Sequence, residues 1–164
     1  MERMMGMTRA EITASLSKSL EKYIDPHNDP RIYWAKEVTF DYATESTIRV
    51  DYMRFAPVNN SVSGIEKGDF YCYEIKSSPA DFASKNGHNF IGDLNYYVMP
   101  EDVAEAVKAQ IPWAVGILVP DAWGDLRVYK KARRTDRSRP ASVMLLMMWR
   151  SSRRELVNQR RKRE

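Results

Sequence analysis

The sequence predicts an α/β domain in which a mixed β-sheet is flanked by α-helices. Short runs of β-branched and aromatic residues alternate with segments that have helical spacing. The early runs follow one another directly, as in an antiparallel meander, whereas a helical segment separates two of the later ones. Strands joined by a tight loop run antiparallel and strands joined through a helix run parallel, so the two kinds of connection together predict a mixed sheet.

The first predicted element is a helix that begins after Thr8. Thr8 and Glu11 have the spacing of a capping box, and Leu16 and Leu20 repeat at a helical interval. The helix is expected to end before Pro26, because the residue that precedes a proline disfavours helical backbone angles.

Three strands are expected to follow at residues 33–40, 47–55 and 70–77, which are rich in β-branched and aromatic side chains. Residues 57–68 contain the asparagines and glycine of a long loop. Residues 79–84 have a proline at their start and predict one helical turn.

The second half of the chain adds a strand at 94–98 and a helix at 100–110, whose first turn contains two acidic residues. The almost wholly apolar run 113–119 is typical of a strand buried on both faces. A short strand at 126–129 is expected next, and a final helix begins at Pro140 with apolar residues and ends in charge.

The C-terminal end of the chain is strongly basic. Residues 1–126 contain 12 lysines and arginines against 19 acidic residues, whereas residues 127–164 contain 14 against 3, although the net charge of the 164-residue chain is only +4. We therefore divide the chain into a domain at 1–139 and a C-terminal helix with a basic end at 140–164. The basic end is suited to binding a polyanion, and a solubilising tail is the alternative.

The cysteine content and the hydropathy indicate where the protein acts. Cys72 is the only cysteine, which excludes an internal disulfide and favours a reducing compartment. No apolar run reaches the length of a membrane span, and the first residues lack the apolar region of a signal peptide. We expect a cytoplasmic protein that does not bind a membrane.

Charged residues interrupt two of the predicted strands. Glu74 and Lys76 are two residues apart on a strand and so face the same side, and Asp51 on a neighbouring strand would complete a cluster. Burying three charges is costly unless they pair or hold a metal. The two carboxylates and the carbonyl of Ile75 predict a site for Mg²⁺ or Mn²⁺, with Lys76 assisting an attacking water. The alternative is a cross-strand salt bridge.

These residues resemble the signature of the PD-(D/E)XK nuclease superfamily, in which an aspartate is followed after a hairpin by Glu74-Ile75-Lys76. The string Glu-Ile-Lys-Ser-Ser-Pro-Ala-Asp-Phe at 74–82 is similar to the MmcB-like DNA-repair branch and to related phage or mobile-element proteins. The resemblance covers about residues 33–130. It implies a restriction-endonuclease-like fold, metal-dependent phosphodiester hydrolysis in DNA processing or repair, metal ligands at Asp51 and Glu74, and a catalytic lysine at Lys76.

The resemblance leaves open which residue supplies an additional acidic ligand. Related proteins often have an acid in the strand that precedes the aspartate, which matches Glu37, and many have one on the first helix, which matches Glu11 or Glu21.

Nucleic-acid contacts are predicted for one histidine and five basic residues. They are Lys85, His88, Lys130, Lys131, Arg133 and Arg134. Basic side chains that neutralise phosphates give affinity that does not depend on sequence. For His88 the alternative is a hydrogen-bonding role within its loop. We expect DNA as the partner, together with a homodimer or a protein that supplies target specificity.

Two other interpretations remain open. The chain could be a non-catalytic nucleic-acid-binding module that keeps the nuclease fold, or a structural or interaction protein. In the last case the charged cluster would be a salt bridge, and the final helix, with Met147 and Trp149, would dock a partner or a second copy.

Overall fold

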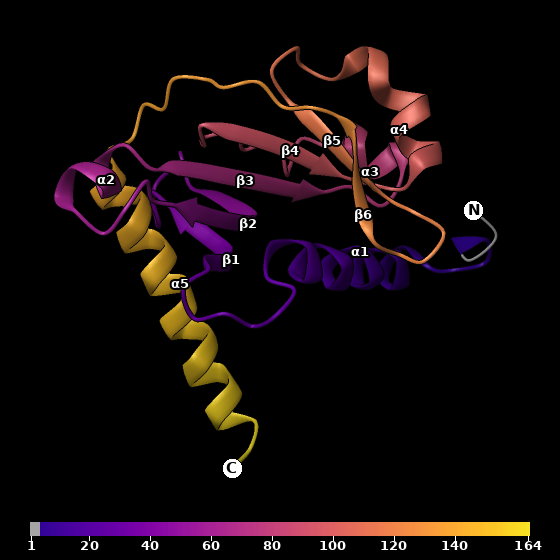
Figure 1. Cartoon of the computed structure of the whole chain (residues 1–164). Coiled ribbons are helices and arrows are strands. Elements are labelled where there is room, and N and C mark those ends of the chain that lie inside the picture. The colour runs from indigo at the N-terminus through magenta and orange to yellow at the C-terminus, as the bar shows by residue number, and fades with distance from the viewer. Residues whose placement is uncertain (1–3) are drawn as a thin grey trace.

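The computed structural model of the chain describes residues 4–164, and its six strands form one sheet (Figure 1). The strands are β1 (Tyr33–Phe40), β2 (Ile48–Ala56), β3 (Asp69–Ile75), β4 (Leu94–Val98), β5 (Gly116–Pro120) and β6 (Leu126–Lys130). The helices are α1 (Arg9–Ile24), α2 (Val62–Glu66), α3 (Pro79–Ala83), α4 (Glu101–Val107) and α5 (Ala141–Arg161).

The order of the strands in the sheet follows their order in the chain. The pairs β1–β2, β2–β3 and β5–β6 are antiparallel, whereas β3–β4 and β4–β5 are parallel. The two parallel connections are the ones that contain helices α3 and α4. The predicted mixed sheet with flanking helices is therefore confirmed.

Helices cover both faces of the sheet (Figure 1). Leu16 and Leu20 of α1 pack against Tyr73 on one face. On the opposite face, α5 covers the strands β1 to β3 and α4 covers β4 and β5. The core is thus divided between the two sides of a single sheet, as expected for a layered α/β domain.

Local sequence explains the start of α1. The Thr8 side chain accepts a hydrogen bond from the Glu11 amide, and the Glu11 carboxylate accepts one from the Thr8 amide at 2.7 Å. This reciprocal pair is the predicted capping box.

The structure differs from the predicted elements in three places. Strand β3 ends at Ile75, so Lys76 lies beyond the strand on which it was predicted. The predicted loop at 57–68 contains the short helix α2, because the Ser61 side chain caps it at the Gly64 amide. Strand β5 begins only at Gly116, since Pro112 and Val115 form a turn (Val115 N to Pro112 O, 3.0 Å) and Trp113 is exposed.

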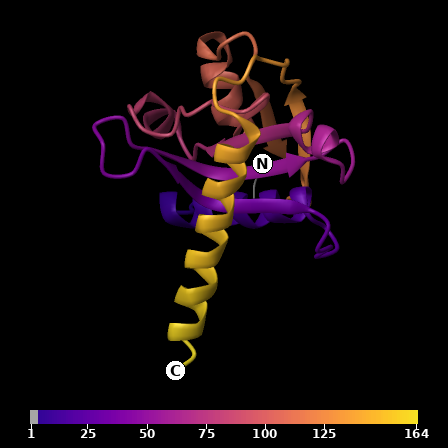
Figure 2. The same ribbon diagram turned by 90° about the vertical axis from the view of Figure 1, so that its left-hand side faces the viewer.

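Helix α5 extends beyond the rest of the fold (Figures 1 and 2). Its buried residues are Ala141, Met144, Met148 and Ser151, all in the first half of the helix. The apolar first half of α5 therefore packs on the sheet, and the arginines of the second half are exposed. Within residues 4–164, no helix is both long enough and apolar enough to cross a membrane.

Candidate functional site

Strands β2 and β3 separate at the predicted acidic residues. Their pairing ends with Tyr52 opposite Tyr73, so the next residues, Asp51 and Glu74, lie opposite each other beyond the last paired position. The backbone amide of Ile75 donates a hydrogen bond of 2.9 Å to Asp51 Oδ2, in place of a strand carbonyl. The separation of the two strands therefore brings two carboxyl groups together at their open end.

Strand β1 is distorted directly opposite Asp51. Pairing between β1 and β2 continues on both sides of Glu37 and Asp51 but does not include them. Glu37 has a φ of +52°, which is unusual for a residue with a side chain inside a strand. Val50 and Met53 of β2 both face the same core, although regular alternation would place them on opposite faces. The kink therefore turns Asp51 out of the regular pleat.

Glu74 is completely buried, and one of its oxygens has no partner. Asn89 donates its backbone amide to Glu74 Oε1 at 3.3 Å, whereas Oε2 has no hydrogen-bond partner among the described residues. Burial, reinforced by the nearby Asp51 carboxylate, raises the pKa of Glu74 to about 9. Burial also raises the pKa of Asp51, and the hydrogen bond from Ile75 opposes this change. The pair is poorly suited to carrying two negative charges without a cation.

Lys76 lies just beyond the end of β3, where its ammonium group reaches the loop that follows α3. Its Nζ donates to the carbonyl oxygens of Asn86 at 2.5 Å and Asp81 at 3.3 Å. Gly87 has a φ of +72°, and a Cβ atom there would lie 2.8 Å from Lys76 Nζ and 3.4 Å from Glu74 Oε2. Only glycine leaves this space open, so the loop packs its backbone against both functional groups.

The donor set suits a hard divalent cation. Among residues 4–164, no group of three or more His, Cys, Asp or Glu side chains could hold a metal ion, which leaves Asp51 and Glu74 as a pair. Mg²⁺ keeps several waters and binds through one or two carboxylates, so a carboxyl pair of this kind matches the ligands that it prefers. A cation fits this donor set, because the buried Oε2 of Glu74 has no hydrogen-bond partner among the described residues.

Asp51, Ile75 and Lys76 line an open cleft with a volume of about 1640 Å³, larger than typical small-molecule pockets, whereas the buried Glu74 lies behind this lining. Its walls come from α1, β1, β2, the loop at 84–89 and the second half of α5. The basic residues that line it are Arg9, Lys18, Lys36, Arg49, Lys76, Lys85, Arg154 and Lys162. Five acids line the same cleft, Glu21, Glu37, Asp51, Asp81 and Glu155, so basic residues are in excess by three. The size and this excess of positive charge favour an extended anionic ligand.

The three candidates for an additional acid lie in different places. Glu37 and Glu21 line the cleft together with Asp51. Glu21 Oε1 accepts a hydrogen bond from the Tyr52 hydroxyl at 2.7 Å. Glu11 caps α1 and is not part of the cleft lining.

The predicted nucleic-acid contacts also divide into separate groups. Lys85 lines the cleft, whereas Lys130, Lys131, Arg133 and Arg134 do not. Arg133 stacks on Trp113, with its guanidinium carbon 4.8 Å from the ring centre. Both ring nitrogens of His88 have partners, Tyr97 Oη at 2.6 Å and Ser84 O at 2.7 Å, so this residue organises the loop.

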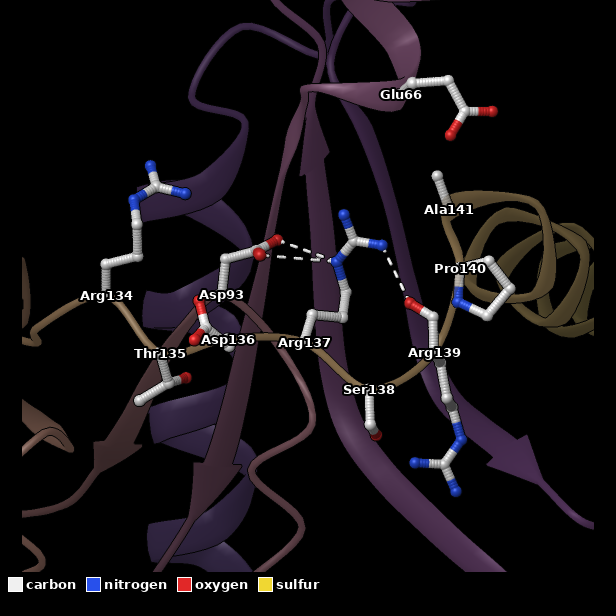
Figure 3. Close-up of a pocket in the computed structure, with 10 residues that line it drawn as sticks. All are labelled: Glu66, Asp93, Arg134, Thr135, Asp136, Arg137, Ser138, Arg139, Pro140 and Ala141. Atoms are coloured by element: carbon white, nitrogen blue, oxygen red, sulfur yellow. Dashed lines mark hydrogen bonds and ion pairs between the residues drawn. The ribbon is translucent and has the colours of Figure 1, made fainter.

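A separate cavity of about 410 Å³ lies along residues 134–141, the segment that joins β6 to α5 (Figure 3). The arginines around it are already paired with acids from the domain. Arg134 pairs with Asp69, and Arg139 pairs with Asp41. Arg137, which is largely buried, pairs with Asp93. These ion pairs hold residues 134–141, which we call the strap, against the domain. The cavity lies along this structural segment.

Several cleft residues were not among the sequence predictions. Arg9, Lys18, Lys36 and Arg49 come from three elements that are brought together only by folding. Arg154 and Lys162 belong to the predicted basic end, whereas Asn158, which lies between them at intervals of four, is a cleft residue that helical periodicity could have identified.

Comparison with known proteins identifies the fold without a function. No protein-family model matches the chain, and no curated protein matches it significantly. A solved structure, described as the SPO1766 protein of unknown function from Silicibacter pomeroyi, is similar with a TM-score of 0.63 and 18% sequence identity, over 94% of this chain and 93% of that protein. At this identity the similarity shows a shared fold alone. The chain is thus an α/β protein with a six-stranded mixed sheet, flanking helices and a long C-terminal helix.

Proposed function

We propose that this protein is a metal-dependent nuclease with a restriction-endonuclease-like fold that acts in DNA processing or repair. One observation carries the proposal. Glu74 is fully buried with an unpartnered Oε2 beside Asp51, at the point where β2 and β3 separate. A buried carboxylate pair of this kind is costly unless a cation compensates its charge. Asp51 of this pair also lines a cleft that is large enough for a polymer and has more basic than acidic residues.

The residues of the site divide the chemistry between them. Asp51, Glu74 and the carbonyl of Ile75 would hold Mg²⁺ or Mn²⁺, which lowers the pKa of bound water and polarises a phosphate when it is bound. The amide of Ile75 orients Asp51, and the amide of Asn89 orients Glu74. Lys76, held by the carbonyls of Asp81 in α3 and Asn86 in the loop that follows, would stabilise negative charge that develops on the phosphate.

The test is cleavage of labelled single-stranded, double-stranded and branched DNA with Mg²⁺ or Mn²⁺. We expect cleavage that requires the metal and is lost in Asp51→Ala, Glu74→Ala and Lys76→Ala. The matched controls are Glu66→Ala and Lys67→Ala, which remove an acid and a lysine from exposed positions outside the cleft. Equal cleavage by the site variants and the controls would refute the proposal.

A non-catalytic nucleic-acid-binding module is the second candidate. One observation favours it: the Lys76 ammonium group is bound by the carbonyls of Asn86 and Asp81, which satisfy two of its three donors. In this case the wild-type protein would bind DNA and leave it intact with either metal. Lys76→Ala would then bind DNA as tightly as the wild type.

A further inference from the structure

The second half of α5 presents a polar face to the cleft. Arg154, Asn158 and Lys162 are spaced four apart and lie on one side of the helix, with Gln159 beside them. All four side chains are exposed. Glu155 lies on the same side, and it pairs with Lys36 at 3.1 Å, so its charge is compensated within the protein. Arg154 donates one hydrogen bond to the carbonyl oxygen of Glu37 at 3.0 Å, and no acid neutralises its charge among the described residues. The face therefore offers two cations and two amides.

Arg154 and Glu155 tie the start of this half to β1, and the later turns project from the domain. The buried positions of α5 end at Ser151, and the views in Figures 1 and 2 show the remaining turns extending past the sheet. With a rise of about 1.5 Å per residue, the turns beyond Ser151 span roughly 15 Å. An isolated helix of this size fits the major groove of B-form DNA, which is about 12 Å wide.

The charge and the residue types of this half fit the same ligand. Residues 150–164 contain seven lysines and arginines against two acids, which favours a polyanion. Arginine, asparagine and glutamine side chains are those that pair with base edges in the major groove. These residues include no aromatic side chain, whereas surfaces for single strands rely on aromatic stacking. The major groove of duplex RNA is too narrow for side chains to read.

We propose that the cleft takes duplex DNA, with the C-terminal half of α5 lying in its major groove. Arg154 and Lys162 contact phosphates, and Asn158 and Gln159 face the base edges. The inference rests on the proposed function, because it uses the cleft of the carboxyl pair. It adds the substrate class and the element that reads it, and it directs the backbone of the duplex toward Asp51, which lines the same cleft in front of the buried Glu74.

The test measures binding without cleavage, by fluorescence anisotropy of the full chain in EDTA over a series of salt concentrations. The probes are a labelled duplex DNA, a single strand of the same sequence and the corresponding duplex RNA. The double variant Arg154→Ala/Lys162→Ala changes the cleft face. Its matched control, Arg153→Ala/Arg160→Ala, removes the same charge from exposed positions outside the cleft lining.

We expect the wild type to prefer duplex DNA over both other probes. The cleft-face variant should lose about tenfold in affinity and lower the slope of log affinity against log salt by about 2, with a smaller change in the control. Asn158→Ala/Gln159→Ala changes no charge and should lose about tenfold at an unchanged salt slope. Equal losses of affinity in the cleft-face variant and in its Arg153→Ala/Arg160→Ala control would overturn the inference. Binding of the single strand as tightly as the duplex would also overturn it.

The outcomes separate this inference from the proposed function. Duplex binding that depends on the cleft face, without any metal-dependent cleavage, leaves the inference standing and removes the nuclease. Metal-dependent cleavage that needs Glu74 and is unaffected by the cleft-face variants would support the nuclease and overturn the inference about α5.

Discussion

The hydroxyl of Ser151 in α5 donates a hydrogen bond to the carbonyl oxygen of Lys36 in β1, 115 residues earlier in the chain. Arg154, one turn further along α5, donates to the carbonyl oxygen of Glu37 at 3.0 Å. Both contacts hold β1 at the kink that lies opposite Asp51. The position of the C-terminal helix and the geometry of the carboxyl pair are therefore linked.

Removing the Ser151 hydroxyl should weaken this link. Ser151→Ala leaves the part-buried carbonyl of Lys36 with one donor fewer, and we expect a loss of about 1 kcal/mol in the free energy of unfolding. Cleavage should fall as well, because the kink loosens opposite Asp51. Urea denaturation and the nuclease assay measure the two effects. Ser152→Ala is the matched control, and an equal effect at that position would contradict the link.

The backbone at Glu37 predicts an uncommon response to glycine. Because its φ is +52°, Glu37→Gly removes the cost of left-handed backbone for a residue with a side chain, and we expect unchanged stability or a gain of up to about 1 kcal/mol. Thr39→Gly, in the regular part of the same strand, should destabilise the protein. Thermal unfolding compares the two variants.

The same position also tests the predicted role of Glu37 as a metal ligand. Glu37→Gln keeps the size of the side chain and removes its charge. If the carboxylate is an outer ligand, Glu37→Gln and Glu37→Gly should both require a higher Mg²⁺ concentration for half-maximal cleavage. If the role of Glu37 lies in its backbone alone, the metal requirement will match that of the wild type.

The raised pKa of Glu74 makes the stability of the metal-free protein depend on pH. Between the ordinary value of 4.5 and the folded value of about 9, the unfolded chain releases a proton that the folded protein keeps. The contribution of Glu74 to the free energy of unfolding should therefore be largest below about pH 4.5, and it should fall as the pH rises toward 9. The greatest slope for one proton is about 1.4 kcal/mol per pH unit.

Glu74→Gln isolates this effect. The difference in unfolding free energy between Glu74→Gln and the wild type should grow from pH 5 to pH 8.5 in EDTA, as measured by urea denaturation. Adding Mg²⁺ should stabilise the wild type increasingly as the pH rises, since binding displaces the proton of Glu74, and should have little effect on the variant. Parallel pH profiles for the two proteins would show that Glu74 titrates normally.

The strap in Figure 3 should contribute to stability without affecting DNA cleavage. Arg137→Ala leaves Asp93 buried without its partner, and we expect a loss of about 3 kcal/mol. Arg134→Ala breaks an exposed pair with Asp69 and should cost no more than about 1 kcal/mol. Cleavage by either folded variant should equal that of the wild type. A selective loss of DNA binding in Arg134→Ala would instead support its predicted contact with nucleic acid.

Much of the architecture follows from local patterns. The interval of the apolar residues and the capping box at Thr8 predict α1, and the runs of β-branched and aromatic residues predict the strands of the sheet to within a few residues. Local periodicity is sufficient here, because it reports which side chains share a face of an element. The same reasoning identified Asp51 and Glu74 as neighbours on adjacent strands, and the structure places them opposite each other.

Other features of the site depend on contacts between distant segments. The left-handed backbone of Glu37, the burial of Glu74 and the carbonyls around Lys76 arise where β1, α5 and the loop at 84–89 meet the sheet. Basic charge along the chain predicted nucleic-acid contacts at Arg133 and Arg134. In the structure, Arg133 stacks on Trp113 and Arg134 pairs with Asp69, two contacts that the local sequence does not indicate. A local pattern shows which face a residue occupies, but only tertiary packing decides what stands opposite that face and which charges remain free.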